Sequence, residues 1–259
     1  MENEYFNSII RRDEKFRYLI NNKKSGTVEF SDQKRINVLE TIFLLNNEIL
    51  EDGYEKLELS YRIFDAYVNE LKDIKHVFHI AIAAFILADK ICVTQKCLDI
   101  YAKHFTDVLY DAFPLDENDC VKLVHNYEVK IFKHLQFDVL FPTLSLVINE
   151  ILQGDEILQE CIIIAMKVIV YHRNLMNIPV YVLAPAIIQY CTTDEKQWPE
   201  WILRKTTVES INETEKILKN SLSFCLLPDL QHWIESAIPL EVDEKKAKRP
   251  RLLNASTFV

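Results

Sequence analysis

Apolar residues recur every three or four positions along most of the chain, which is the period of an amphipathic helix. No segment shows the strict alternation of apolar and polar residues that is typical of a half-buried strand. Ser31 suits the N-cap position of the second predicted helix. The pattern predicts an all-α protein with helices over about residues 2–22, 32–50, 55–70, 75–91, 94–105, 118–135, 143–153, 155–173, 179–192, 197–204, 207–224 and 228–237.

Two of the predicted helices are apolar on every side, over residues 77–88 and 180–190. A helix without a polar face is normally buried. We therefore expect two units of five helices, each packed around one of these two helices. The predicted boundaries are 1–30 for an N-terminal helical arm, 31–141 for the first unit, 142–226 for the second unit, 227–240 for a short C-terminal helix and 241–259 for a tail.

Composition and charge exclude several classes of protein. The chain has 259 residues but only 3 glycines, and α/β folds with phosphate-binding loops generally use more. Its formal net charge of −9 disfavours a general nucleic-acid binder. The six cysteines form no C-x-x-C pair, and the first ten residues lack the features of a signal peptide. We therefore expect an intracellular protein with free thiols and no membrane partner.

The last residues differ from the rest of the chain. From Glu241 the helical period is lost, and we expect a disordered tail. The tail has 5 basic and 3 acidic residues, so the remaining chain carries −11. The basic cluster predicts a nuclear localisation signal, and a merely solvated tail is the alternative. The residues of the cluster are Lys245, Lys246, Lys248, Arg249 and Arg251.

The sequence lacks the common signatures of catalysis. It contains no G-x-G-x-x-G, no P-loop motif and no G-x-S-x-G nucleophile motif. His76 and His79 have helical spacing, but no third metal ligand accompanies them, so we interpret them as an edge and a core histidine. We expect no catalytic, cofactor-binding or metal site, and therefore a non-enzymatic protein.

A carboxylate interrupts the apolar stripe of the helix predicted over 118–135. Glu128 lies within the stripe that Val121, Val124, Ile131 and Leu135 form. Burying a carboxylate without a partner costs several kcal/mol or forces it to take up a proton. Glu128 therefore needs a charge partner or a place at an interface.

Several stretches together resemble the cyclin box. "AAFILADK" ends at Lys90, and "YE" at 127–128 is followed nine residues later by "FD" and then by "PT". "SYRIFDAY" is similar to the second helix of that box, and "VYVLAPAII" after Pro179 to the third helix of the second box. The resemblance covers nearly the whole chain. It implies two tandem five-helix cyclin boxes, with an extra N-terminal helix and a short C-terminal helix.

The resemblance also implies a function and a set of residues. In cyclins, a lysine and a glutamate at the positions of Lys90 and Glu128 lie together and bind the C-helix of a cyclin-dependent kinase. Phe137 matches the family's aromatic residue after the fifth helix. The chain would then be a non-catalytic regulatory subunit without a cofactor. We expect Glu128 to lie at an exposed rim of the free protein, where it can hydrate.

Within the family, three features are similar to cyclin H: the arm "DEKFR", the long gap between Lys90 and Glu128, and the lysine-rich tail after the second box. They imply arm contacts by Lys15, Phe16 and Arg17. They also imply a RING-bearing assembly subunit and transcription factor IIH as partners.

The sequence also departs from the family. No acidic pair follows Lys90, and "KRINVLETIFLL" lacks the tryptophan of the substrate-docking patch. The alternatives are another transcription-type cyclin of the C or K/T kind, a cell-cycle cyclin or a virus-encoded cyclin. A general transcription factor that binds DNA with the same helical fold is a further alternative, which the acidic charge disfavours. An all-helical enzyme would need paired acidic metal motifs, which we do not find.

Overall fold

The computed structural model describes residues 2–22, 30–49, 54–69, 76–92, 117–154, 157–192 and 197–222. All regular elements in these ranges are helices, which confirms the predicted all-α fold. The α-helices are α1 (Glu2–Asn21), α2 (Asp32–Ile49), α3 (Tyr54–Val68), α4 (Val77–Cys92), α6 (Glu117–His134), α7 (Leu144–Leu152), α8 (Leu158–Tyr171), α9 (Val180–Cys191), α10 (Glu200–Leu203) and α11 (Val208–Leu222), and η1 (Arg173–Asn177) is a 3₁₀ helix. The helices predicted over 94–105 and 228–237, and the tail over 241–259, lie outside the described residues.

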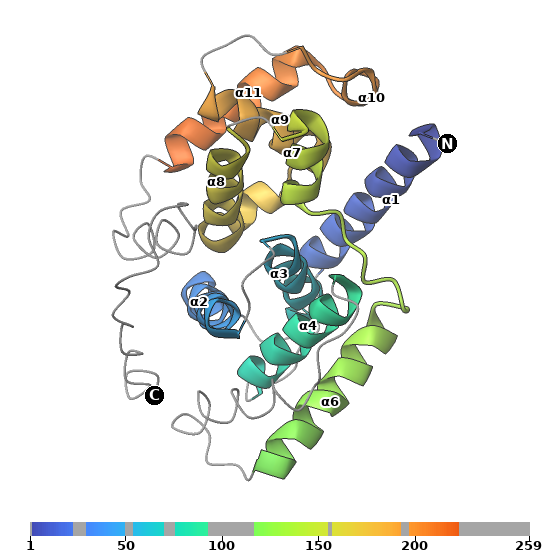
Figure 1. Cartoon of the computed structure of the whole chain (residues 1–259), viewed down its shortest axis with the longest axis vertical. Coiled ribbons are helices and arrows are strands. Elements are labelled where there is room, and N and C mark those ends of the chain that lie inside the picture. The colour runs from blue at the N-terminus through green and yellow to red at the C-terminus, as the bar shows by residue number, and fades with distance from the viewer. Residues whose placement is uncertain are drawn as a thin grey trace.

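The helices form two groups, with α1 lying alongside both (Figure 1). In the first group α4 packs against α2, α3 and α6, and in the second α9 packs against α7, α8 and α11. Both central helices are apolar and largely buried, as their sequences predict. No helix in the described ranges is long and apolar enough to cross a membrane.

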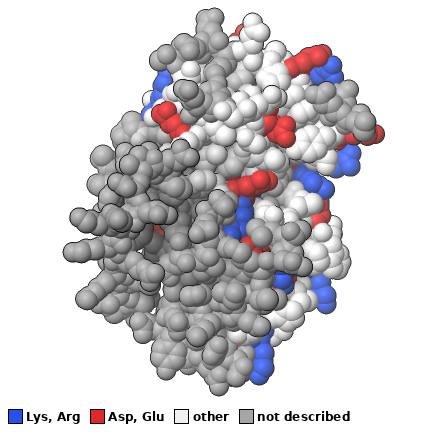
Figure 2. All heavy atoms as spheres, in the orientation of Figure 1, with Lys and Arg blue, Asp and Glu red and all other residues white. Residues whose placement is uncertain are grey.

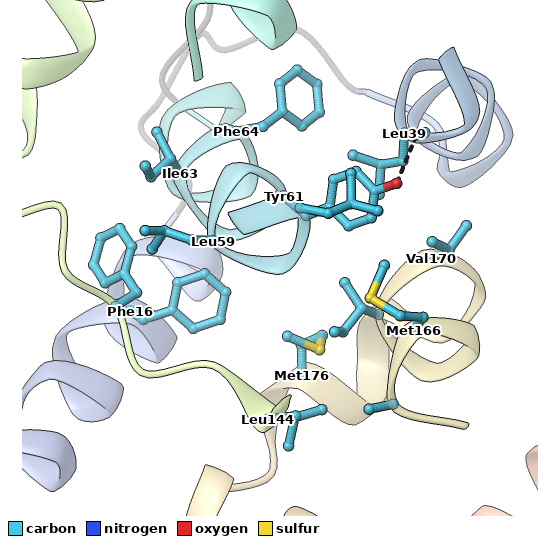
Figure 3. Packing of buried hydrophobic residues seen from close by; sticks show 14 of the residues in the cluster. Phe16, Leu39, Leu59, Tyr61, Ile63, Phe64, Leu144, Met166, Val170 and Met176 are labelled. Atoms are coloured by element: carbon cyan, nitrogen blue, oxygen red, sulfur yellow. Dashed lines mark hydrogen bonds between the residues drawn. The ribbon is translucent and has the colours of Figure 1, made fainter. Parts of the chain in front are cut away.

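One hydrophobic core runs through both groups. Figure 3 draws Phe16 of α1, Tyr61 of α3, Met166 of α8 and Met176 of η1, which all belong to this one cluster. The hydroxyl of the fully buried Tyr61 donates a hydrogen bond to the carbonyl of Leu39, at 2.9 Å. A buried hydroxyl needs such a partner, so this contact fixes α3 against α2.

Two carboxylates of the N-terminal half bind helix N-termini of the C-terminal half. Glu58 of α3 accepts hydrogen bonds from the backbone amide of Leu144 and from the amide of Ser145, the latter at 2.9 Å. Asp13 of α1 accepts from the amide of Val180 at 3.2 Å. Helix N-termini have unpaired amides and a positive partial charge, so both carboxylates stabilise the start of a helix from outside it.

A buried arginine joins the groups at a third place. The guanidinium of Arg35 in α2 donates to both carboxylate oxygens of Asp65 in α3, each at 2.6 Å. It also donates to the carbonyls of Ile169 and Val170 near the end of α8, each at 2.8 Å. Both charged side chains are almost fully buried, and the guanidinium of α2 finds its acceptors on two other helices, α3 and α8.

Candidate functional site

The structure brings Lys90 and Glu128 together where α4 packs against α6. Lys90 stands in the last turn of α4, and its ammonium donates a hydrogen bond to Oε1 of Glu128. The two side chains differ in exposure: that of Lys90 is 42% exposed and that of Glu128 only 9%. The pair therefore presents a cation to solvent and keeps most of its anion inside.

The expectation that Glu128 lies at an exposed rim is wrong. Val124 and Ile131, on the same stripe of α6, are buried, and Glu128 is buried with them. The stripe turns away from the core only at Val121, which is exposed. The packing of α4 against this stripe explains the difference, because it covers the carboxylate while leaving the end of Lys90 in water.

One oxygen of Glu128 is not used within the described part of the chain. Oε2 is buried and has no hydrogen-bond partner there. The nearest charged or titratable group recorded beside it is the imidazole of His125, whose Nδ1 lies 3.5 Å away. A buried carboxylate oxygen without a donor is costly, so this atom is suited to receive one from outside the chain.

Phe137 follows α6 in an unusual backbone conformation. Gln136 and Phe137 have φ angles of 56° and 62°, in the left-handed region. The amide of Phe137 donates to the carbonyl of Phe132 at 2.9 Å, and that of Gln136 to the carbonyl of Lys133 at 3.1 Å. This is a Schellman motif, and the edge-to-face contact of the Phe137 and Phe132 rings at 5.0 Å is its hydrophobic contact. The Phe137 side chain is nevertheless 65% exposed.

The three predicted arm residues make contacts within the chain. The ammonium of Lys15 lies 3.1 Å from the carboxylate of Asp138, and Nε of Arg17 donates to Asp13 at 3.0 Å. Phe16 is completely buried against the core. The ring of Phe16 therefore holds α1 to the rest of the molecule, and partner contacts by the arm residues stay a prediction.

A cleft that the sequence did not predict has Ile91, the residue after Lys90, in its lining. Its volume is about 360 Å³. Tyr5 and Leu140, both 44% exposed, lie at its edge. Burial raises the pKa of the Cys92 thiol in its wall to about 11, with Glu55 adding to the effect, so this cysteine is not an activated nucleophile. The lining residues are Tyr5, Ser8, Ile9, Arg12, Glu55, Leu59, Ile91, Cys92, Leu140, Phe141, Pro142, Thr143 and Leu146.

The remaining candidate residues are the two histidines of α4 and its start, and the basic cluster of the tail. His79 is fully buried and His76 partly buried, in agreement with their interpretation as a core and an edge histidine. Within the described ranges, no three His, Cys, Asp or Glu side chains are placed to hold a metal ion. The basic cluster from Lys245 to Arg251 lies outside the described residues. On the described part of the face in Figure 2, basic and acidic side chains are interspersed.

Comparison with known proteins establishes the fold. No protein-family model and no curated protein sequence matches the chain. Among solved structures it is similar to a chain of the yeast RNA polymerase II CTD kinase CTDK-1 complex, with a TM-score of 0.60 and 17% identity over 81% of this chain and 70% of the other. It is also similar to a viral cyclin from herpesvirus saimiri, with a TM-score of 0.62 and 15% identity over 85% of this chain and 96% of the other. The chain has the cyclin fold.

Within the cyclin fold, the two helix groups correspond to the arrangement that the sequence resemblance implies. The predicted fold class is thereby confirmed. The low identities also explain why only short stretches of the sequence carry the resemblance.

Proposed function

We propose that this chain is the regulatory subunit of a protein kinase, which binds and activates a cyclin-dependent kinase without being catalytic itself. The observation that carries the proposal is the Lys90–Glu128 pair: an exposed ammonium on a buried carboxylate, one oxygen of which has no hydrogen-bond partner among the described residues. Such a pair offers a partner both donors and an acceptor at one point. The cyclin fold of a neighbour that forms part of a kinase complex supports the same function.

The chemistry of the pair suits the end of a helix or an adjoining loop of the partner. The ammonium of Lys90 has three N–H groups, of which Glu128 uses one, so it can donate to backbone carbonyls of the partner. Oε2 of Glu128 can accept from a backbone amide. Holding the C-helix of a kinase inward in this way completes the ion pair between the kinase's own lysine and glutamate, which phosphoryl transfer requires.

Exposed apolar groups after α6 and the apolar lining of the cleft would supply most of the affinity. Phe137 and Leu140 are exposed, and Ile91, next to Lys90, lines the cleft of about 360 Å³. Large apolar side chains that become buried at the centre of an interface dominate its binding energy. We therefore expect the kinase to cover Phe137 and to place an apolar side chain in the cleft.

The substitution Glu128→Ala tests the proposal. It removes the acceptor for the partner and leaves Lys90 without its carboxylate. Truncating one member of a desolvated charge pair costs about 2–5 kcal/mol of binding, which is roughly a 30- to 1000-fold or greater loss of affinity. The measurement is the dissociation constant against a panel of purified cyclin-dependent kinases, together with the kinase activity that each complex shows.

The free protein should tolerate this change better than the complex. Lys90 is partly exposed, so its ammonium can hydrate once Glu128 is gone. Asp119→Ala is the matched control, because Asp119 is an exposed acidic residue on the same helix and pairs with the exposed Lys122, at 3.4 Å. It should change neither binding nor stability. Normal kinase binding by the Glu128 variant would exclude the proposed role of the pair.

Within this function we propose the cyclin H role, in the kinase-activating complex of transcription factor IIH. Support comes from the arm, the long gap between Lys90 and Glu128 and the basic tail. Other transcription-type, cell-cycle and virus-encoded cyclins are the alternatives, and a viral cyclin is among the similar structures. Affinity purification of the tagged chain distinguishes them, because only the cyclin H role predicts that a RING-bearing assembly subunit is recovered with the kinase.

We also propose that the protein is nuclear and that its basic tail cluster directs it there. Deleting residues 245–251 should move the protein from the nucleus towards the cytoplasm, because the remaining chain is acidic and loses its basic signal. Fluorescence microscopy of the tagged variant beside the full chain measures this. Unchanged nuclear location would show that the cluster is not required.

A further inference from the structure

Oε2 of Glu128 lies beside the side chain of His125, which can change its charge. His125 precedes Glu128 by one turn of α6, and its Nδ1 lies 3.5 Å from Oε2. The His125 side chain is 64% exposed, whereas that of Glu128 is 9% exposed. The imidazole is thus an exposed group in contact with an oxygen that is buried and has no hydrogen-bond partner among the described residues. A partner that donates to Oε2 therefore competes with the imidazole for this oxygen.

We propose that His125 acts as a gate, which means that it controls the access of a partner's donor to Oε2 of Glu128. Protonation of its ring closes this gate. The inference rests on the proposed function, since it concerns how a kinase reaches the same carboxylate. A neutral imidazole has one N–H and one acceptor nitrogen and carries no charge. The protonated ring donates from both nitrogens and attracts the carboxylate. The kinase then competes with an ion pair of the chain itself.

Two other charged groups lie near this carboxylate in space or in sequence. Lys90 approaches from α4 and occupies Oε1. Asp89, its neighbour in sequence, lies 3.4 Å from Lys56 in a buried ion pair between α3 and α4. Among the described residues, His125 is thus the group recorded at this carboxylate whose type changes charge between pH 5 and 8.

The substitution His125→Ala tests the gate. It removes the ring without touching the pair, so the variant should bind the kinase more tightly than the wild type. We expect a gain of about threefold to fivefold at pH 6.0 and a smaller gain at pH 8.0, because an exposed ion pair contributes modestly. The measurement is the dissociation constant of the full chain at both values of pH, by calorimetry, with a purified cyclin-dependent kinase that the wild type binds.

Lys122→Ala is the matched control, since Lys122 is exposed and lies one turn before His125 on the same helix. It should keep the pH dependence of the wild type. Any pH dependence that belongs to the kinase appears in all three proteins and cancels in the comparison. Equal affinities of wild type and His125→Ala at both values of pH would overturn the gate.

A second experiment needs no kinase and so separates failure of the gate from failure of the proposed function. In the free chain, His125→Ala should lower the melting temperature by about 1–3 °C at pH 5.5 and leave it unchanged at pH 8.0. In the Glu128→Gln background the same substitution should have no effect at either pH. An equal effect in both backgrounds would overturn the contact on which the gate depends, whether or not the chain binds a kinase.

Discussion

The buried histidine of α4 makes the folded protein sensitive to acid. His79 is fully buried, and burial together with the nearby His76 lowers its pKa to about 4. An imidazole in an unfolded chain takes up a proton near pH 6.5. Between these values the unfolded chain binds more protons than the folded one, so stability falls as the pH drops from about 6.5 towards 4. The expected loss from this group is about 2–3 kcal/mol by pH 4.5.

The substitution His79→Leu isolates that contribution. Other groups also titrate, and the carboxyl groups of Asp13 and Glu40, whose pKa values burial raises, act in the opposite direction. These contributions are common to the wild type and the variant. The difference in the free energy of unfolding between pH 7.5 and pH 4.5 should therefore be smaller in His79→Leu. Urea unfolding at the two values of pH measures it. If this difference in the free energy of unfolding were the same in both proteins, protonation of His79 would not destabilise the folded state.

Part of the candidate site could be predicted from the sequence, residue by residue. Residue spacing placed Glu128 in a stripe with Val124 and Ile131, and that spacing already implied burial with them. The expected exposed rim came from the resemblance instead, and it was wrong. Phe137 is exposed after a turn whose left-handed residue is Gln136, where glycine is usual, so no residue pattern predicted that turn.

At the level of elements, α7 depends on a charge from another helix. Glu58 of α3 accepts from the amides of Leu144 and Ser145 and from the Ser145 hydroxyl at 2.8 Å, and it lies 3.2 Å from Nε of the buried Arg62. Glu58→Ala should destabilise the protein by about 3–5 kcal/mol, because it leaves two amides and a hydroxyl of α7 without their acceptor, and the buried Arg62 with the more distant carboxylate of Asp13, at 4.0 Å. The free energy of unfolding in urea measures the effect.

Glu55→Ala is the control for that prediction. Glu55 precedes Glu58 by one turn on α3 but is exposed. Removing it should change the free energy of unfolding by less than about 0.5 kcal/mol, as for most surface substitutions. If both variants unfolded at the same urea concentration, the contacts of Glu58 with α7 would not contribute to stability.

The bounds of most helices could be predicted because their signals are local. The apolar period, the hydroxyl of Ser31 at the start of α2 and Pro142 with Thr143 before α7 all act within a few residues. The way in which the elements join could not be predicted. Glu58 contacts a residue 86 positions away, and Asp13 contacts one 167 positions away. Neither partner is marked by any pattern near these carboxylates.

For the whole molecule, those distant contacts connect the two cyclin-like halves into one cooperative unit. Their cores form one cluster, and Glu58, Asp13 and Arg35 bridge them with charged groups that are almost entirely buried. Separating the halves would expose apolar surface and leave these charges without their partners. The bridges should therefore make unfolding of one half destabilise the other strongly.

The distribution of tryptophan allows this cooperativity to be measured. The chain has three tryptophans, at positions 198, 201 and 233, all in its C-terminal part. Their fluorescence therefore reports on the second half and, through Trp201 stacked on Phe6 at 4.0 Å, on the docking of α1. Circular dichroism at 222 nm reports on helices throughout. The two unfolding curves in urea should coincide, and they should still coincide in Arg35→Met at a lower midpoint, because that change weakens both halves together. A fluorescence transition separated from the loss of helix would show that the halves unfold independently, despite the core and the charges that they share.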